Sequence, residues 1–269
     1  MPSHPFDAAI ALEPTESRGM SRGRTSPDWA NMVGPFGGIT AAVLLRAVAV
    51  HPDRAGDPVA LTVNYTAPVL DGTFDVHPRA LRTNRTNQHW AVDLSQQGEV
   101  KTNATAVFGL RRDTWSDTEP SMPAAPAPED IAPTGLPDAV VWAANYDMRY
   151  VDGGVPRPGD GPASSSTTTL WTRDRSGRAL DFPALAAISD IFYPRVFLRR
   201  GAMSPAGTIS LTTYFHVDDD ELASAGNDFV LCRAHANRFS RGYFDQSAEI
   251  WSRSGNLLAS THQLVYYKA

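Results

Sequence analysis

Apolar and polar residues alternate along much of this chain, and a few continuous apolar runs interrupt the alternation. The first long run, FGGITAAVLLRAVAV at residues 36–50, is typical of a buried helix. Strand-like segments rich in Val, Thr, Tyr and Phe follow at residues 59–66, 73–82, 89–97 and 100–110. The first part of the chain is therefore predicted to be one long helix followed by a meander of strands.

The same order of elements returns after residue 138. YDMRYV at residues 146–151 and TTTLWTRD at residues 167–174 read as strands, and a second apolar helix is predicted at residues 183–193. Asp181 is expected to cap this helix, Pro183 to lie in its first turn and Pro194 to end or kink it. Further strands are predicted at residues 207–217, 228–238, 243–252 and 257–267, with a hairpin turn at residues 254–256.

A proline-rich segment separates these two similar parts. Residues 116–138 lose all helical and strand periodicity, which is typical of a linker. We therefore predict an N-terminal domain at residues 1–115, a linker at 116–138 and a C-terminal domain at 139–269. In each domain one apolar helix supplies the surface against which the inner faces of an antiparallel sheet can pack. The predicted fold class is α+β, a double hotdog made of two fused units of this kind.

Composition and charge narrow the function. The chain has 269 residues, 42% of them hydrophobic and 20% charged, as in an ordinary folded protein. Its net charge of -5 argues against a nucleic-acid partner, which would require a basic face. Cys232 is the only cysteine, so an intramolecular disulfide and a cysteine-based zinc site are excluded, and a cytoplasmic protein is expected. No segment reads as a signal peptide or a membrane span, so no membrane association is expected.

Motifs in both halves of the chain fit one known family. The first half contains GPFGGITAAVLLRA from Gly34 and VNYTAPVLDG from Val63, and the second contains YDMRYV, LWTRD, AISDIFYP, TISLTTYFH and LLASTHQ. Together these motifs resemble the acyl-CoA thioesterase II (TesB-like) family over nearly the whole chain. The resemblance implies a double hotdog enzyme of fatty acid metabolism that cleaves acyl-CoA to a free acid and CoA. The family's functional residues fall on Asp190, Thr208 and Gln263.

These three residue types suit the hydrolysis of a thioester. A thioester carbonyl is already electrophilic and its thiolate leaves readily, so an oriented water and a polarised carbonyl oxygen are the main requirements. Asp190, partly dehydrated on a helix that faces the sheet, can accept a proton from water, while Thr208 and Gln263 hold the water or the oxyanion. The division of labour between Thr208 and Gln263 stays open. No metal and no cofactor are predicted.

The first half lacks the matching polar groups. Aligning the two halves places Val59 opposite Thr208 and Ala106 opposite Gln263, so one active site per chain is expected, in the second half. Substrate-binding roles are expected for the backbone N–H groups of Gly37 and Gly38, at the start of the first helix. Arg238 and Arg241 are expected to meet the phosphates of CoA.

Other functions are weighed against hydrolysis. The main alternative is a non-catalytic hotdog protein that binds acyl-CoA, and a second is an enoyl-CoA hydratase-type hotdog, for which no suitable Asp and His pair is evident. His216 and Asp220 form an H-x-x-x-D string used in acyl transfer by larger enzymes, but residues 218–220 are interpreted as a solvated acidic turn. No G-x-S-x-G string for a serine nucleophile occurs. Edge strands of such sheets can pair between chains, which leaves a homodimer open.

Overall fold

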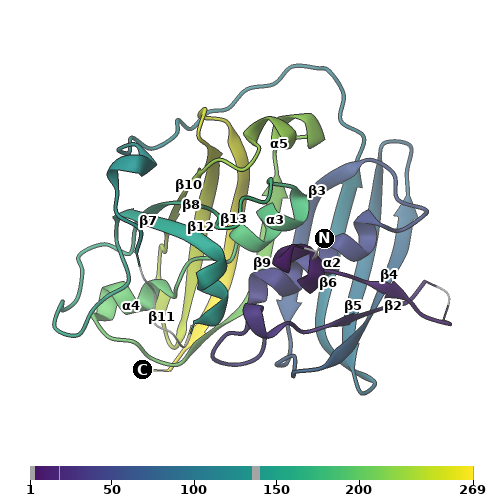
Figure 1. Ribbon diagram of the computed structural model, residues 1–269, viewed down its shortest axis with the longest axis horizontal. Helices are drawn as coiled ribbons and strands as arrows, with labels where there is room; N and C mark the ends of the chain where they lie inside the picture. Colours follow the sequence, from purple (N-terminus) through teal and green to yellow (C-terminus); the bar gives the residue numbers. More distant parts are fainter. Residues whose placement is uncertain (1–3, 18, 135–139, 269) are drawn as a thin grey trace.

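The strands form one continuous antiparallel sheet in this computed structural model, which describes residues 4–17, 19–134 and 140–268 (Figure 1). The first half contributes β1 (Glu13–Pro14), β2 (Ser21–Arg24), β3 (Asp57–Tyr65), β4 (Thr73–Thr83), β5 (Asn87–Gln96) and β6 (Glu99–Gly109). The second contributes β7 (Tyr146–Asp152), β8 (Thr168–Asp174), β9 (Ala206–Phe215), β10 (Val230–His235), β11 (Phe239–Ser240), β12 (Tyr243–Ser252) and β13 (Leu257–Tyr267). The strands predicted from the sequence are confirmed, with small shifts at their ends.

The two halves join in the middle of this sheet. The strand order is β1-β2-β4-β5-β6-β3-β9-β13-β12-β10-β8-β7, so β3 of the first half pairs directly with β9 of the second. Thr62 lies opposite Thr212 at the centre of this pair, and their Oγ1 atoms are 3.0 Å apart. A local pseudo-twofold axis between these two threonines relates the paired strands of the two halves, so a residue on β3 or β6 has a counterpart on β9 or β13.

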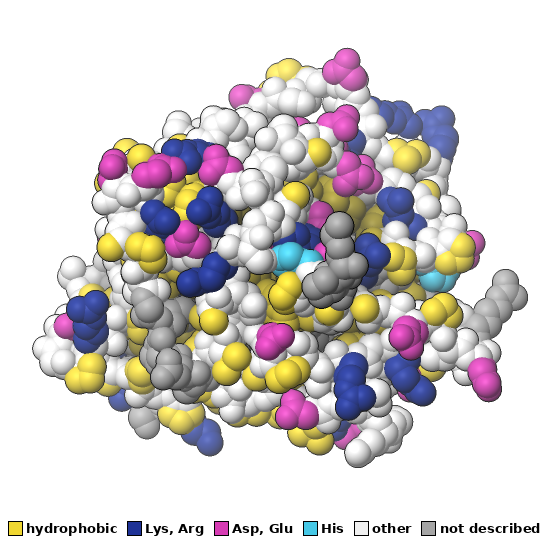
Figure 2. Space-filling view, in the orientation of Figure 1, with side chains coloured by type: hydrophobic (Ala, Val, Ile, Leu, Met, Phe, Trp, Pro, Cys, Tyr) yellow, Lys and Arg dark blue, Asp and Glu magenta, His cyan; other side chains and the backbone are white. Residues whose placement is uncertain are grey.

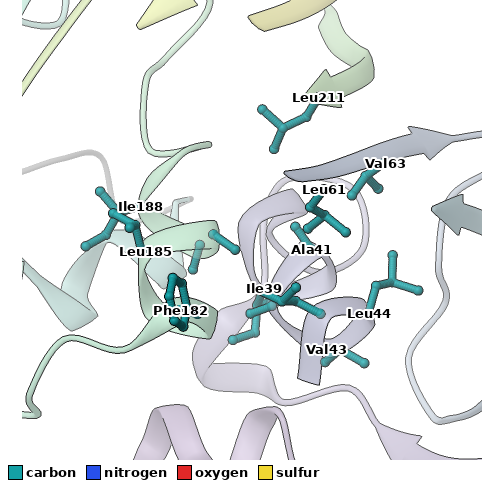
Figure 3. Packing of buried hydrophobic residues seen from close by; sticks show 14 of the residues in the cluster. Ile39, Ala41, Val43, Leu44, Leu61, Val63, Phe182, Leu185, Ile188 and Leu211 are labelled. Carbon is teal, nitrogen blue, oxygen red and sulfur yellow. The ribbon is translucent and has the colours of Figure 1, made fainter. Parts of the chain in front are cut away.

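Two helices pack together on the inner face of the sheet. They are α2 (Gly37–Ala49) and α3 (Phe182–Ile188), which lie side by side in Figure 3. The helices approach so closely that a Cβ atom on Gly38 would lie 2.4 Å from the carbonyl oxygen of Ala187. The glycine is required there because no larger residue leaves room for the neighbouring backbone. The predicted double hotdog fold is confirmed.

The second helix is shorter than predicted. The sequence predicts a helix at residues 183–193, but α3 ends at Ile188 and Asp190 lies in the turn that follows it. A separate helix, α4 (Arg195–Arg200), begins after Pro194. Pro194 separates the two helices, because it has no N–H to donate to the carbonyl of Asp190 and disfavours a helical conformation in Tyr193. The predicted cap is confirmed, because the Asp181 side chain accepts a hydrogen bond from the backbone N–H of Ala184 at 2.8 Å.

The acidic segment at residues 218–220 is solvated, as predicted, but it starts a helix instead of forming a turn. It begins α5 (Asp219–Ala225), where Asp218 and Glu221 form a reciprocal capping box. The remaining helical segments are α1 (Pro5–Ala9), η1 (Pro27–Trp29), η2 (Pro128–Asp130) and η3 (Val141–Asn145). No helix in the described part of the chain is long and apolar enough to cross a membrane.

The described part of the proline-rich segment contains no strand, and it crosses from the first half to the outer edge of the second (Figure 1). There the indole N–H of Trp171 donates to the carbonyl oxygen of Pro126 at 2.9 Å. Nη1 of Arg149 donates to the carbonyl oxygen of Pro128 at 2.7 Å. The segment is therefore attached to the second half along part of its length. The domain limits near residues 116 and 138 stay a prediction.

Candidate active site

Asp190 lies where the two halves of the molecule meet. It belongs to the turn after α3 in the second half, and its carboxylate reaches the first turn of α2 in the first half. A Cβ atom on Gly37 would lie 2.5 Å from Asp190 Oδ2, and the backbone N–H of Gly38 hydrogen-bonds to the carboxylate. The partial positive charge of a helix N-terminus favours an anion at this place.

A pair of glutamines completes the polar surroundings of Asp190. Gln263 on β13 donates from Nε2 to Asp190 Oδ1 at 2.7 Å. Gln246 on β12 lies directly opposite Gln263 and donates from its Nε2 to Gln263 Oε1 at 3.0 Å. Because Gln246 occupies the oxygen of the Gln263 amide, the NH₂ group of Gln263 is directed at Asp190. Both glutamines are buried, so this orientation is held away from bulk water.

Thr208 reaches the same site through an irregularity in β9. Gln263 pairs with Leu211, but Val265 pairs with Thr208, so Ile209 is an extra residue in the ladder. Such a bulge shifts the alternation of side chains by one position. Thr208 therefore faces inward with Gln263 and Val265 and lines the same cavity as Asp190.

The surroundings of Asp190 change its acidity. Burial raises the pKa of its carboxyl to about 7, although the hydrogen bonds from Gln263 and Gly38 act in the opposite direction. The side chain is half-buried by surface area, and we attribute its exposure to the cavity that it lines. A carboxyl group with a pKa near neutrality can both accept and return a proton at physiological pH.

The cavity beside these residues has a volume of about 170 Å³ and is polar on one side only. Asp190, Thr208, Gln246 and Gln263 form the polar side. The apolar side includes Phe36, Trp142, Ile191, Phe192 and Phe197, all of them buried. Met32 is 63% exposed and Met203 is 55% exposed, so these two residues lie at the mouth. A polar cluster beside an apolar pocket can bind an apolar group and place a polar bond of the ligand next to a proton acceptor.

The other residues predicted for the site are placed differently. Gly37 and Gly38 do lie at the start of α2, but the N–H of Gly38 contacts the Asp190 carboxylate, and neither glycine lines the cavity. Arg238 and Arg241 are exposed beside β11 and do not line the cavity either. They form no ion pair with the described residues.

Two positioning residues are missing from the sequence-based prediction. Gln246 has a buried amide on β12, where the other inward residues include Phe244, Ala248 and Ile250. A single polar residue among these apolar inward positions was the feature of the sequence that could have identified it. Tyr65 donates from its hydroxyl to the carbonyl oxygen of Gly37 at 2.8 Å and so braces the helix start against which Asp190 lies. Nothing in the sequence around Tyr65 distinguishes it from other strand tyrosines.

The pseudo-twofold axis identifies the counterparts of these residues in the first half. Leu61 pairs with Ala106 as Leu211 pairs with Gln263, which makes Ala106 the counterpart of Gln263 as predicted. Pro58 pairs with Phe108 as Thr208 pairs with Val265. The prediction that Val59 lies opposite Thr208 is therefore wrong by one residue: Pro58 holds that position.

Comparisons with known proteins point to one family. Residues 25–109 match the model of an acyl-CoA thioesterase N-terminal domain, and residues 117–267 match the model of an acyl-CoA thioesterase C-terminal domain. A conserved protein of unknown function with a hot dog fold from Alicyclobacillus acidocaldarius is 43% identical, with a TM-score of 0.94 over 99% of each chain. A search of the curated proteins found no match.

More distant solved structures share the architecture. The acyl-CoA thioesterase II TesB2 from Mycobacterium marinum is 19% identical, with a TM-score of 0.75 over 98% of each chain. A tesB protein from Mycobacterium avium subspecies paratuberculosis is 19% identical, with a TM-score of 0.79 over 98% of each chain. At this level of identity the likeness shows the fold.

Proposed function

This chain belongs to the acyl-CoA thioesterase family, and we propose that it hydrolyses acyl-CoA thioesters to a free carboxylic acid and CoA with Asp190, Thr208 and Gln263. The observation that carries the proposal is the Asp190 carboxylate, which accepts a hydrogen bond from Gln263 at the polar side of an otherwise apolar cavity. Fold alone would not assign a reaction, because hotdog units can bind acyl groups without hydrolysing them.

Asp190 acts as the general base in the proposed reaction. Its ionised carboxylate takes a proton from a water molecule as the water oxygen bonds to the thioester carbonyl carbon, and the carbonyl oxygen becomes an oxyanion. When this tetrahedral intermediate collapses, the C–S bond breaks and the leaving thiolate receives the proton from Asp190. A pKa of about 7 supports both steps, because the carboxyl group can hold and release this proton near neutral pH.

Gln263 and Thr208 orient the reactants. The second N–H of the Gln263 amide and the Thr208 hydroxyl both belong to the cavity side of the site, where they can hold the water or stabilise the oxyanion. The hydrogen bond from Gly38 keeps the Asp190 carboxylate in place. A glycine at residue 37 leaves the space that this close approach requires.

The CoA moiety extends from the mouth of the cavity in this proposal. Arg238 and Arg241 flank β11, outside the cavity, and we assign them to the phosphates of CoA. Their guanidinium groups are exposed and can contact phosphates, and charge reversal at both positions should raise KM more than it lowers kcat.

A panel of acyl-CoA substrates tests the proposed function. Release of free thiol would be measured with a thiol reagent for acyl groups from C2 to C18, with the wild type and with Asp190→Asn. The wild type should turn over at least one substrate, and the variant should lose roughly 10²- to 10⁴-fold in kcat. If acyl-CoA binds but no substrate releases thiol, the chain is a non-catalytic acyl-CoA binding protein. Near-normal turnover by Asp190→Asn removes Asp190 from the mechanism.

Hydration of an enoyl-CoA has less support. That reading requires a histidine beside the acidic residue, and no histidine is among the described residues that line the cavity. Addition of water to crotonyl-CoA by the wild type would revive it. A cytoplasmic location and assembly as a homodimer stay predictions.

A further inference from the structure

The cavity that Asp190 lines is small, and buried aromatic side chains close it on the side of α4. Its volume of about 170 Å³ is close to the roughly 150 Å³ of an engineered protein cavity that holds one benzene molecule. By the same proportion a ten-carbon chain needs roughly 250 Å³. The whole cavity therefore has room for about six carbon atoms.

Helix α4 and the turn before it close the far end. Val265 lies two residues beyond Gln263 on β13, and it packs in one cluster with Phe197 of α4. Phe197 is 3% exposed, and its ring stacks against that of Tyr193 with centroids 6.4 Å apart. These aromatic rings therefore stand where a longer acyl chain would continue.

The closed end is also anchored rigidly. The Tyr193 hydroxyl hydrogen-bonds to the carbonyl oxygens of Gly153 and Gly154, at 2.7 and 2.9 Å. Arg195 is fully buried, donates from Nε to the carbonyl oxygen of Tyr193 at 3.0 Å, and places its guanidinium 4.2 Å from the centre of the Tyr193 ring. Its Nη1 also donates to the Thr168 hydroxyl.

These contacts oppose any opening of the closed end. Arg195 forms no ion pair with the described residues, so its guanidinium depends on these oxygens and on the ring. Moving α4 outward would strip a buried cation of its hydrogen bonds, which is strongly unfavourable. The closed end is therefore expected to keep its position when an acyl group enters.

We propose that this cavity selects compact acyl groups of about six carbons, straight-chain or aromatic, and excludes chains of ten carbons or more. This inference shares one assumption with the proposed function, namely that the acyl group of the ligand binds in this cavity. Up to the closed end, each added methylene should tighten binding about fourfold, as expected for burial of a CH₂ group. For chains that reach beyond the closed end, affinity should fall. The extra carbons must either displace the anchored aromatic rings or move the acyl group away from its position beside Asp190.

Binding of inert analogues tests the size limit without requiring turnover. S-hexyl-CoA and S-decyl-CoA are thioethers that cannot be hydrolysed, and their Kd values for the wild type can be measured by calorimetry. We expect S-hexyl-CoA to bind at least tenfold more tightly than S-decyl-CoA. Equal affinity, or tighter binding of S-decyl-CoA, overturns the proposed limit whether or not the protein is a hydrolase. Conversely, if the protein binds S-hexyl-CoA more tightly than S-decyl-CoA but releases thiol from no acyl-CoA, the size limit is supported and the proposed function is overturned.

A pair of variants tests which residue sets the limit. Phe197→Ala should extend the cavity and improve S-decyl-CoA binding relative to S-hexyl-CoA by at least tenfold. Phe229→Ala is the matched control, because Phe229 is equally buried at 3% exposure but packs in a separate cluster with Trp171, Leu231 and Trp251. The control should keep the wild-type ratio. If both variants change the ratio alike, or if Phe197→Ala leaves it unchanged, Phe197 does not set the limit and the assignment of the closed end is wrong.

Discussion

The two halves of this chain place different residues at the same positions of one fold. In the second half, Leu211, Gln263 and Gln246 lie side by side on neighbouring strands. In the first half the corresponding row is Leu61, Ala106 and Trp90. Trp90 is fully buried and fills with its indole the space that the glutamine network uses in the other half.

The helices differ in the same sense. α2 continues without a break from Gly37 to Ala49, whereas α3 ends at Ile188, and Asp190 lies in the turn that follows. The unbroken helix supplies its N-terminus to the site, and the broken one supplies the carboxylate. The first half therefore has a filled apolar core, whereas the second half has a polar cavity at the corresponding place. The site includes residues from both halves.

Among the changes that test this comparison of the halves, the largest effect is expected when the second half receives the residue of the first. Gln263→Ala removes the hydrogen bond to Asp190 and a cavity-facing donor, and it should lower kcat by about 10²- to 10³-fold. Steady-state thiol release measures this. His262→Ala is the control, because His262 is the adjacent residue on the outer face of the same strand and should retain near-wild-type kcat. A variant with Gln263→Ala and unchanged kcat would show that the two halves do not differ in function at this position.

Gly37→Ala tests the contribution of the first half. The new Cβ would lie 2.5 Å from Asp190 Oδ2, so the carboxylate must move away from the start of α2. We expect kcat to fall by about 10- to 100-fold, since a displacement of about 1 Å can cost that much in an active site. The measurement is kcat together with the thermal midpoint of unfolding. Retention of kcat within twofold would mean that the first half acts only as a scaffold.

Gln246→Met sharpens the comparison at the position where the first half has Trp90. Without Gln246 the amide of Gln263 is free to flip and present its oxygen to Asp190, which favours the protonated carboxyl and raises its pKa further. The wild-type kcat should rise with pH through about 7. In the variant this rise should move to higher pH, and kcat at pH 7 should fall by about tenfold. A lower kcat with an unshifted pH profile would instead indicate a purely structural role.

The smallest expected effect concerns stability. The folded-state pKa of Asp190, about 7, is above the ordinary value of 3.8, so the folded protein binds this proton more tightly than the unfolded chain does. The stability contributed by the protonated carboxyl is complete below about pH 4 and is lost as the pH rises through 7. Asp190→Asn should therefore raise Tm at pH 8 by roughly 2–4 °C, the shift expected for about 1 kcal/mol in a chain of this size. The gain should shrink at pH 5, and an equal gain at both pH values would contradict this linkage.

Much of the architecture was determined by the sequence itself. Periodicity located the strands and both central helices, because burial on one face imposes a period on each element that can be read locally. The family resemblance carried by AISDIFYP and LLASTHQ also made Asp190 and Gln263 candidates for one site, and their side chains are hydrogen-bonded in the structure.

Only the tertiary structure decided how these residues work together. The break at Ile188 and the bulge at Ile209 are departures from regular geometry, and they set where Asp190 and Thr208 point. Gln246 and Tyr65 act through partners that are distant in sequence, so no local pattern marks them. The neutral-range pKa of Asp190 likewise arises from burial between two halves that meet only after folding, which is why the sequence could name the carboxylate but not its acidity.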